Sequence, residues 1–327
     1  MVSSQVMRCW AFDWPGLQYE PPERPGGRPP PLPDRALWEP GRRWVFDDPT
    51  GSGSVWVLAA VQMDTDPIQL LEVNAGQPPD ETTVLTAIER RWKGAVVAKA
   101  RTPGERHPRI WRGDYSEPGQ DERERFSGAV TSANVLLDRF RHVLRTIEPD
   151  QANRQAFGHE IRQLLILACT DVESAWKTIL VENGYSEAKN DRYSTNDYCK
   201  LRDVLKLEEW EVQLTMFRRY GAIAPFRGWD PGKPTESLGW YADYNSTKHD
   251  RETNLPRANL ANLISSIAGL YVMLAAQAGP KRLSRAPYAI LDFQVTHSPR
   301  WGLADEYVPP IGRSNADLPG ATLVPYF

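Results

Sequence analysis

The residues best suited to chemistry in this chain lie together in one stretch, Gly239 to Arg251. Asn245, Lys248, His249 and Arg251 fall within seven residues there. In a helix, Asn245 and His249 lie one turn apart on the same face, with Lys248 on the flank. That face offers an imidazole that titrates near neutral pH, a carboxamide that orients a ligand, and cations suited to a phosphate. This stretch is therefore the main candidate for a functional site.

Aromatic side chains accompany these polar groups. Tyr241 shares the helix face of Asn245 and His249. Tyr244 and Trp240 lie beside it. Trp229, Trp240 and Tyr241 lie beside cations and could stack the bases of single-stranded RNA. The alternative is that these aromatic residues belong to the core, which is more common at helical spacing. The net charge of −3 gives no global attraction to nucleic acid, so any contact with RNA must be local.

His249 suits general base catalysis. Cations on its flanks disfavour the charged imidazole, which keeps a base available near neutral pH. Lys248 or Arg251 would then stabilise negative charge on a phosphoryl group.

The alternative is a structural role for the same residues. Asn245 and His249 would form hydrogen bonds across a helical bundle, with the carboxylate of Glu160 or Asp171 as partner. These two acids lie eleven residues apart on one predicted helix, at the edge of its apolar face. From there they could also reach Lys248 or Arg251 on a neighbouring helix.

The composition excludes several classes of site. Cys9, Cys169 and Cys199 are far apart and form no CxxC pair, so we expect neither a zinc site nor a disulfide framework, as in a reducing cytosol. The histidines show no metal-ligand spacing. P-loop, GxGxxG, HExxH and GxSxG motifs are absent. We therefore expect no metal and no cofactor.

Two segments bear on a membrane. Met1 to Trp14 lacks the basic start and apolar run of a signal peptide. Ala258 to Ala278 is largely apolar but contains polar residues such as Asn259, Asn262 and Ser266, which a membrane span tolerates poorly. The sequence thus predicts a buried core helix and a cytoplasmic protein without membrane contact.

Helical periodicity begins near Phe126 and predicts the elements that position the candidate site. The predicted helices are Ala129 to Ile147, Glu160 to Val181, Asn196 to Tyr220 with Gly221 as C-cap, the motif helix itself, and one starting at Asn254 and Pro256 and ending at Gly279. Packing such helices side by side gives an α-helical bundle.

The first third of the chain lacks the long helical periodicity of the region after Phe126. Pro21 to Pro33 is a proline-rich run, which predicts an extended polyproline II arm or, alternatively, an SH3-type ligand. Ser54 to Met63 is typical of a buried strand, with Arg43 to Phe46 as partner across a turn at Gly51 to Gly53. The stretch from residue 82 to 100 predicts a helix capped at Thr82 or Thr83, although its second half equally suits a strand.

The sequence therefore predicts an α+β protein, mainly an α-helical bundle preceded by a small mixed α/β region and proline-rich arms. The predicted segments are an extended arm over residues 1–39, the mixed region over 40–125, the bundle over 126–280 and an extended C-terminal tail over 281–327. The tail contains one strand-like piece, Tyr288 to Val295.

Three segments resemble HEPN-type helical domains, namely Leu164 to Glu173, Pro225 to Trp229 and Trp240 to Arg251. The resemblance covers about residues 126–280. Members of this superfamily are often found in bacteria as uncharacterised proteins, and others act in anti-phage defence and toxin–antitoxin systems. The resemblance implies a bacterial protein that forms a homodimer through its helical domain.

Ribonucleases of this family are metal-independent, place an arginine four to six residues before a histidine, and leave a cyclic phosphate. By the resemblance, His249 takes the place of the catalytic histidine and Asn245 that of the polar residue. Tyr244 stands where the family has arginine, so Lys248 or Arg251 would have to supply the positive charge.

Three functions follow from these observations. The first is a metal-independent endoribonuclease of a defence or stress system that acts on RNA. The second is a non-catalytic dimerisation or adaptor module in which Asn245 and His249 are structural and the N-terminal region binds a protein partner. The third is a small-molecule sensor, because a helical bundle can enclose a pocket.

Overall fold

The computed structural model describes residues 8–14, 41–47, 55–59, 68–71, 79–113, 120–186, 192–285, 287–308 and 322–327. The chain divides into two compact units, residues 1–106 with 301–322 and residues 107–300 with 323–327. Both units combine helices with antiparallel strands, so the fold is α+β, as the sequence predicts. The division differs from the predicted segments because both ends of the chain contribute to folded units.

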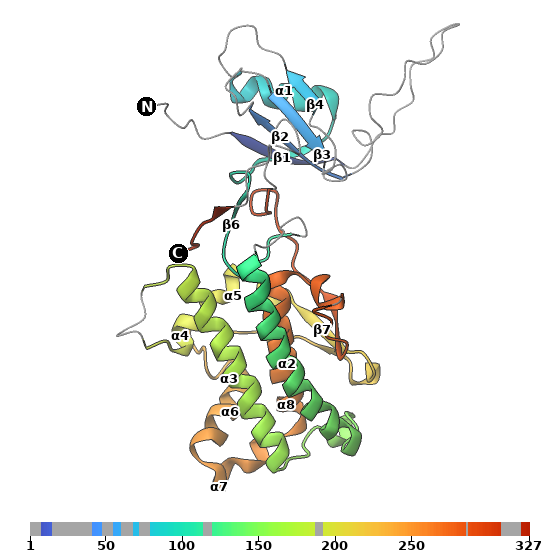
Figure 1. Ribbon diagram of the computed structural model, residues 1–327, viewed down its shortest axis with the longest axis vertical. Helices are drawn as coiled ribbons and strands as arrows, with labels where there is room; N and C mark the ends of the chain where they lie inside the picture. Colours follow the sequence, from blue (N-terminus) through green and yellow to red (C-terminus); the bar gives the residue numbers. More distant parts are fainter. Residues whose placement is uncertain are drawn as a thin grey trace, which may run out of the picture. The chain divides into compact units, whose positions relative to one another are not determined.

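The first unit is built on a five-stranded antiparallel sheet with the order β4-β3-β2-β1-β5 (Figure 1). Its strands are β1 (Cys9–Trp14), β2 (Gly41–Asp47), β3 (Val55–Ala59), β4 (Ile68–Leu71) and β5 (Val96–Lys99). The predicted pairing of β3 with β2 is confirmed, with Val45 opposite Val57. β1 lies in the range predicted as an extended arm, and its residues Cys9 to Phe12 are buried. The predicted Pro21 to Pro33 arm and the predicted turn at Gly51 to Gly53 lie outside the described residues.

Helix α1 (Glu81–Arg91) packs its buried residues Val84 and Ile88 into the core of this sheet. The predicted cap at Thr82 or Thr83 is wrong, because the N-cap is Asp80, whose carboxylate accepts the Thr83 N–H at 2.7 Å. The helix ends near Gly94, whose positive φ of 78° breaks the helical backbone, and β5 follows. The first unit also contains the short strand β6 (Glu105–Arg106). Thr322, the first residue of β10 (Thr322–Leu323), donates its N–H to the backbone carbonyl of Gly104.

The second unit is organised around three long helices, α2 (Gln120–Thr146), α3 (His159–Glu182) and α8 (Leu260–Ala278), which lie side by side (Figure 1). Their apolar positions recur at helical spacing and form one shared core. Among the described residues α8 is the one helix long and apolar enough to cross a membrane, and most of it is buried in the unit. Its N-cap is Asn259, not Asn254, since Leu255–Arg257 forms a separate 3-10 turn.

The predicted third helix, Asn196 to Tyr220, is wrong. This segment contains two short helices, α4 (Thr195–Tyr198) and α5 (Leu201–Val204), followed by strand β7 (Glu211–Leu214). Lys206 adopts a left-handed backbone with φ of 48°, which ends the helical run. Within β7 the buried residues are Val212 and Leu214, and burial of every second residue is the pattern of a strand. The predicted C-cap Gly221 ends a 3-10 turn with φ of 93°.

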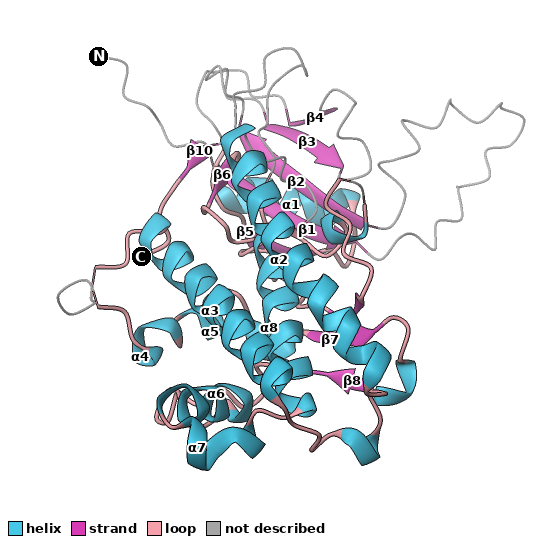
Figure 2. Ribbon diagram, turned by 60° about the horizontal axis from the view of Figure 1, so that its bottom comes forward, coloured by secondary structure: helices cyan, strands magenta, loops and turns pink. Residues whose placement is uncertain are grey.

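A three-stranded antiparallel sheet with the order β8-β7-β9 covers one side of the helices (Figure 2). It consists of β7, β8 (Ala222–Ile223) and β9 (Phe293–His297). β9 lies in the predicted C-terminal tail, but its Phe293 is buried and stacks on Phe140 of α2. Residues up to 300 are therefore part of the helical unit rather than an extended tail.

Trp176 in the C-terminal half of α3 is fully buried at the centre of an aromatic cluster. Its ring centroid lies 5.0 to 6.5 Å from those of five other rings, namely Tyr198, Phe226, Trp229, Trp240 and Tyr241. The indole N–H has no acceptor among the described residues, so Trp176 stabilises the unit by packing.

We expect Trp176→Ala to lower the free energy of unfolding by about 3–5 kcal/mol, because the cavity it leaves removes contacts to five rings at once. Chemical denaturation followed by far-ultraviolet circular dichroism measures the change. Leu167→Ala is the matched control, because Leu167 lies on the same helix and is exposed. It should change the free energy by no more than about 0.5 kcal/mol, and equal effects of the two variants would contradict the central role of Trp176.

Candidate functional site

The predicted motif forms helix α6 (Gly239–His249) and the short α7 (Arg251–Asn254), which lie beside the start of α3 (Figure 1). The inner face of α6 buries Trp240, Tyr241, Tyr244 and Thr247. The Trp240 indole also donates a hydrogen bond of 2.7 Å to the carbonyl of Pro225. Trp229 is buried as well, so the predicted stacking of RNA bases on Trp229, Trp240 and Tyr241 does not match the position of these rings.

Hydrogen bonds from the inner face of α6 fix its position. The Tyr241 hydroxyl donates to Glu173 of α3 at 2.7 Å. Burial, together with this contact, raises the pKa of Tyr241, so the phenol is neutral. The Lys248 ammonium donates to the Tyr244 hydroxyl at 2.9 Å and lies 5.1 Å from the ring centroid. That hydrogen bond raises the pKa of Lys248, which therefore stays cationic.

Cys169 lies on α3 one turn before Glu173 and is fully buried. Burial raises the pKa of its thiol well above the usual range, and the nearby Glu173 raises it further. The thiol is therefore protonated and unreactive.

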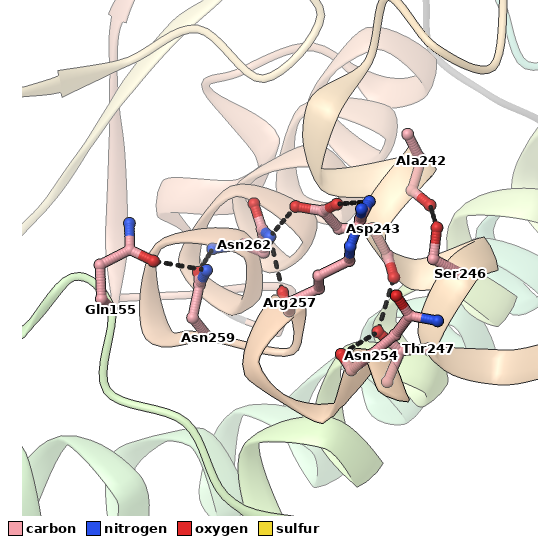
Figure 3. A network of polar contacts seen from close by, with 9 residues as sticks. All are labelled: Gln155, Ala242, Asp243, Ser246, Thr247, Asn254, Arg257, Asn259 and Asn262. Carbon is pink, nitrogen blue, oxygen red and sulfur yellow. Dashed lines mark hydrogen bonds and ion pairs between the residues drawn. The ribbon is translucent and has the colours of Figure 1, made fainter. Parts of the chain in front are cut away.

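The last turn of α6 is held by side chains from other segments. Arg162 of α3 donates to the carbonyl of Thr247 at 3.2 Å, near the C-terminus of α6, where a cation is favoured. The Thr247 hydroxyl lies 2.7 Å from the Asp243 carbonyl and 3.3 Å from the Asn254 carbonyl (Figure 3). Asp250 then caps α7 by accepting the Thr253 N–H at 3.2 Å.

A second group of polar contacts ties α6 to the start of α8. Asp243 accepts from Arg257 at 3.2 Å and from Asn262 at 2.8 Å (Figure 3). Asn262 also donates to the backbone carbonyl of Arg257 at 2.8 Å. The N-cap Asn259 donates to Gln155 at 3.1 Å, which joins this group to the segment before α3.

The outer end of the motif is different, because it presents polar groups that the fold leaves open. His249 and Arg251 are exposed, and Asn245 is half-buried. None of these three side chains makes a hydrogen bond or an ion pair with another described residue. The hydrogen-bond network expected for Asn245 and His249 is thus formed by other residues of the same helix.

The two predicted acidic partners of the motif lie elsewhere. Glu160 is exposed and forms an ion pair of 2.9 Å with Arg139 of α2. Asp171 is half-buried, and burial raises the pKa of its carboxyl group. The acid that meets α6 is Glu173, which the sequence reasoning missed. Glu173 lies three residues before Trp176, at the edge of the apolar face of α3. This position in the sequence could have identified it as an acid that faces a neighbouring helix.

Among the residues that the structure describes, no three His, Cys, Asp or Glu side chains come together in a way that could hold a metal ion. Comparisons of the chain with protein-family models, with curated proteins and with solved structures find no match. The HEPN likeness therefore depends on the sequence segments named above and stays a prediction.

The contact between Tyr241 and Glu173 can be measured by a double-mutant cycle. Tyr241→Phe and Glu173→Gln should each destabilise the unit, with a coupling energy of about 1 kcal/mol or more, because a phenol donates here to a carboxylate. Denaturation curves of the single and double variants give the coupling. Tyr288→Phe serves as control, since the Tyr288 hydroxyl makes no hydrogen bond with another described residue, and should change the free energy by no more than about 0.5 kcal/mol. Strictly additive effects would show that the two groups do not interact.

Asp171 gives a prediction for pH. Burial raises its folded-state pKa, so the stability it contributes is present at low pH and is lost as pH rises through that pKa. The Asp171→Asn variant has no carboxyl group to ionise at this position, so it does not lose this stability as pH rises. We expect the variant to melt at a higher temperature than the wild type at pH 7, with a smaller difference at pH 3, where the carboxyl is protonated in both states. A difference that does not depend on pH would contradict this assignment.

Proposed function

We propose that the second unit is a HEPN-like helical module and a metal-independent endoribonuclease of a bacterial defence or stress system. The observation that carries the proposal is the open state of Asn245, His249 and Arg251. Asn245 and His249 lie in the second half of α6 and Arg251 begins α7, while neighbouring polar side chains of α6 are engaged by the fold. A substrate can reach these three groups without disturbing the core.

The proposed reaction is an attack of the ribose 2′-hydroxyl on the adjacent phosphate. His249 takes the proton from this hydroxyl as the new oxygen–phosphorus bond forms. The bond from phosphorus to the 5′ oxygen breaks, and this oxygen takes up a proton, which leaves a 2′,3′-cyclic phosphate and a free 5′-hydroxyl. Lys248 and Arg251 hold the phosphate, and Asn245 orients it.

Lys248 can supply the positive charge that the arginine provides in the family's ribonucleases. Tyr244 occupies the position of that arginine and is fully buried, but its hydroxyl accepts a hydrogen bond from the Lys248 ammonium. A permanent cation is therefore fixed at the outer end of the Tyr244 ring. This contact supports Lys248 as the substitute for the guanidinium, although an ammonium lacks its bidentate geometry.

The second candidate function is a non-catalytic dimerisation or adaptor module. It is favoured by the burial of Trp240, Tyr241 and Tyr244, because the most distinctive residues of the motif serve packing. Both functions include a homodimer through the helical unit, and in the second the N-terminal region would bind a protein partner.

Cleavage of a labelled single-stranded RNA tests the proposal. The wild type should cleave in the presence of a metal chelator and leave a cyclic phosphate. His249→Ala should reduce the rate by at least about 100-fold, the usual contribution of a general base. Its melting temperature should not change, because the side chain is exposed and without partners in the described part of the chain.

His142→Ala is the matched control, since His142 is an exposed histidine of α2 away from α6. It should cleave like the wild type. Full activity of the His249→Ala variant, or no cleavage of any RNA by the wild type, would exclude the nuclease and leave the adaptor. Asn245→Ala should lower the rate less than His249→Ala, because an orienting amide does not accept the proton.

A further inference from the structure

The second unit contains a cavity of about 1080 Å³ that takes no part in the site on α6. Its walls come from the C-terminal half of α2, the end of β7, the 3-10 turn η8 (Arg282–Ser284), β9 and Tyr271 of α8. Small-molecule sites commonly measure about 300–1000 Å³, so this cavity is large enough for a ligand. Its inner surface is mainly apolar, with Phe140, Leu144, Ile290 and Phe293 among the lining residues.

Tyr271 places a hydrogen-bond donor in this apolar wall. The residue is only 5% exposed, and its ring stacks on Phe293 with centroids 5.5 Å apart. Its hydroxyl makes no hydrogen bond with another described residue. Burial raises the pKa of Tyr271 to about 12, so the group is a neutral donor at physiological pH. A bound molecule with an oxygen could accept a hydrogen bond from this hydroxyl.

The charged residues of the cavity are mainly cationic. The lining includes Arg141, Arg145 and Lys281, against a single acid, Asp292. Asp292 is already engaged by Arg141, with distances of 2.6 and 2.7 Å between their atoms. Arg145 lies one turn further along α2, is exposed, and forms no ion pair with another described residue. The whole chain has a net charge of −3, so the cationic lining of the cavity is opposite in sign to the charge of the chain as a whole.

Apolar side chains continue outward from the cavity. Met216 is 83% exposed and Leu291 is 70% exposed, and both line it. Exposed apolar groups beside a concave apolar surface extend the area that a ligand can cover. The cavity therefore combines an apolar interior, a cationic group at Arg145 and the hydroxyl of Tyr271 as a neutral hydrogen-bond donor.

We propose that this cavity binds a small amphipathic carboxylate. The apolar body of the ligand packs between Phe140, Leu144 and Phe293, and the carboxylate lies at Arg145. Burial of the apolar body supplies most of the affinity, and the charge of Arg145 selects the head group. The site would make the helical unit responsive to a ligand, and it does not depend on the nuclease proposal.

Three probes with the same ten-carbon chain separate the apolar contribution to binding from that of the head-group charge. Each is used below its micelle concentration. They are decanoate, decan-1-ol and decyltrimethylammonium, and calorimetric titration of the full chain measures their binding. Decanoate should bind more tightly than decan-1-ol, and decyltrimethylammonium should bind most weakly. Equal affinity for decanoate and decyltrimethylammonium, or no binding of decanoate, would overturn the proposal.

Variants locate the binding site on the protein. Arg145→Gln should weaken decanoate binding about threefold to fivefold and leave decan-1-ol unchanged, because an exposed cation contributes modestly. Arg125→Gln, an exposed residue of the same helix outside the cavity, is the control and should bind like the wild type. Thr215→Trp fills part of the cavity and should weaken binding of both probes more than tenfold, with near-ultraviolet circular dichroism reporting that the variant is folded. Unchanged binding in both cavity variants would place the ligand elsewhere and overturn the proposal.

Discussion

The second unit depends on the packing of one side chain, Trp176 in the C-terminal half of α3. Its indole touches rings from α4, from the segment between β8 and α6, and from α6 itself. Aromatic pairs hold defined separations and tilts, so this cluster fixes how α6 lies on α3. The hydrogen bond from Tyr241 to Glu173 requires that register, as does the contact of Arg162 with Thr247. The direction in which the open end of α6 points is therefore set by contacts on its buried side.

The long helices could be predicted from sequence because each buries one stripe of apolar residues at helical spacing. This holds for α2, α3 and α8, and the apolar run around β3 equally identified a buried strand with β2 as its partner. The segment from residue 196 to 220 could not be predicted in the same way. Leu207, Trp210 and Leu214 have helical spacing, while Val212 and Leu214 alternate as in a strand. The left-handed backbone at Lys206 decides between them, and a lysine gives no sequence signal for it.

The candidate site was predictable as a location but not as a set of contacts. Four of its residues were chosen for their chemistry, and the structure places Asn245, Lys248 and His249 on α6 and Arg251 at the start of α7. Which acid would meet that helix depends on how α3 is rotated and shifted against α6, and no local pattern encodes this. Glu160 therefore lies against Arg139 of α2, while Glu173 takes the place beside Tyr241. The cavity beside β9 was equally hidden, because its walls come from segments far apart in the chain.

The pairing of β7 with β9 has a consequence for how the chain is made. These two strands enclose α6, α7 and α8 in the sequence, and β9 is the last of them to leave the ribosome. Strand pairing across so long a loop is slow, because the chain loses the entropy of the whole loop before any hydrogen bond forms. Until Phe293 arrives, the side of α8 that carries Tyr271 has no cover from the sheet. A nascent chain thus passes through a period in which its most apolar helix is open to chaperones and to other copies.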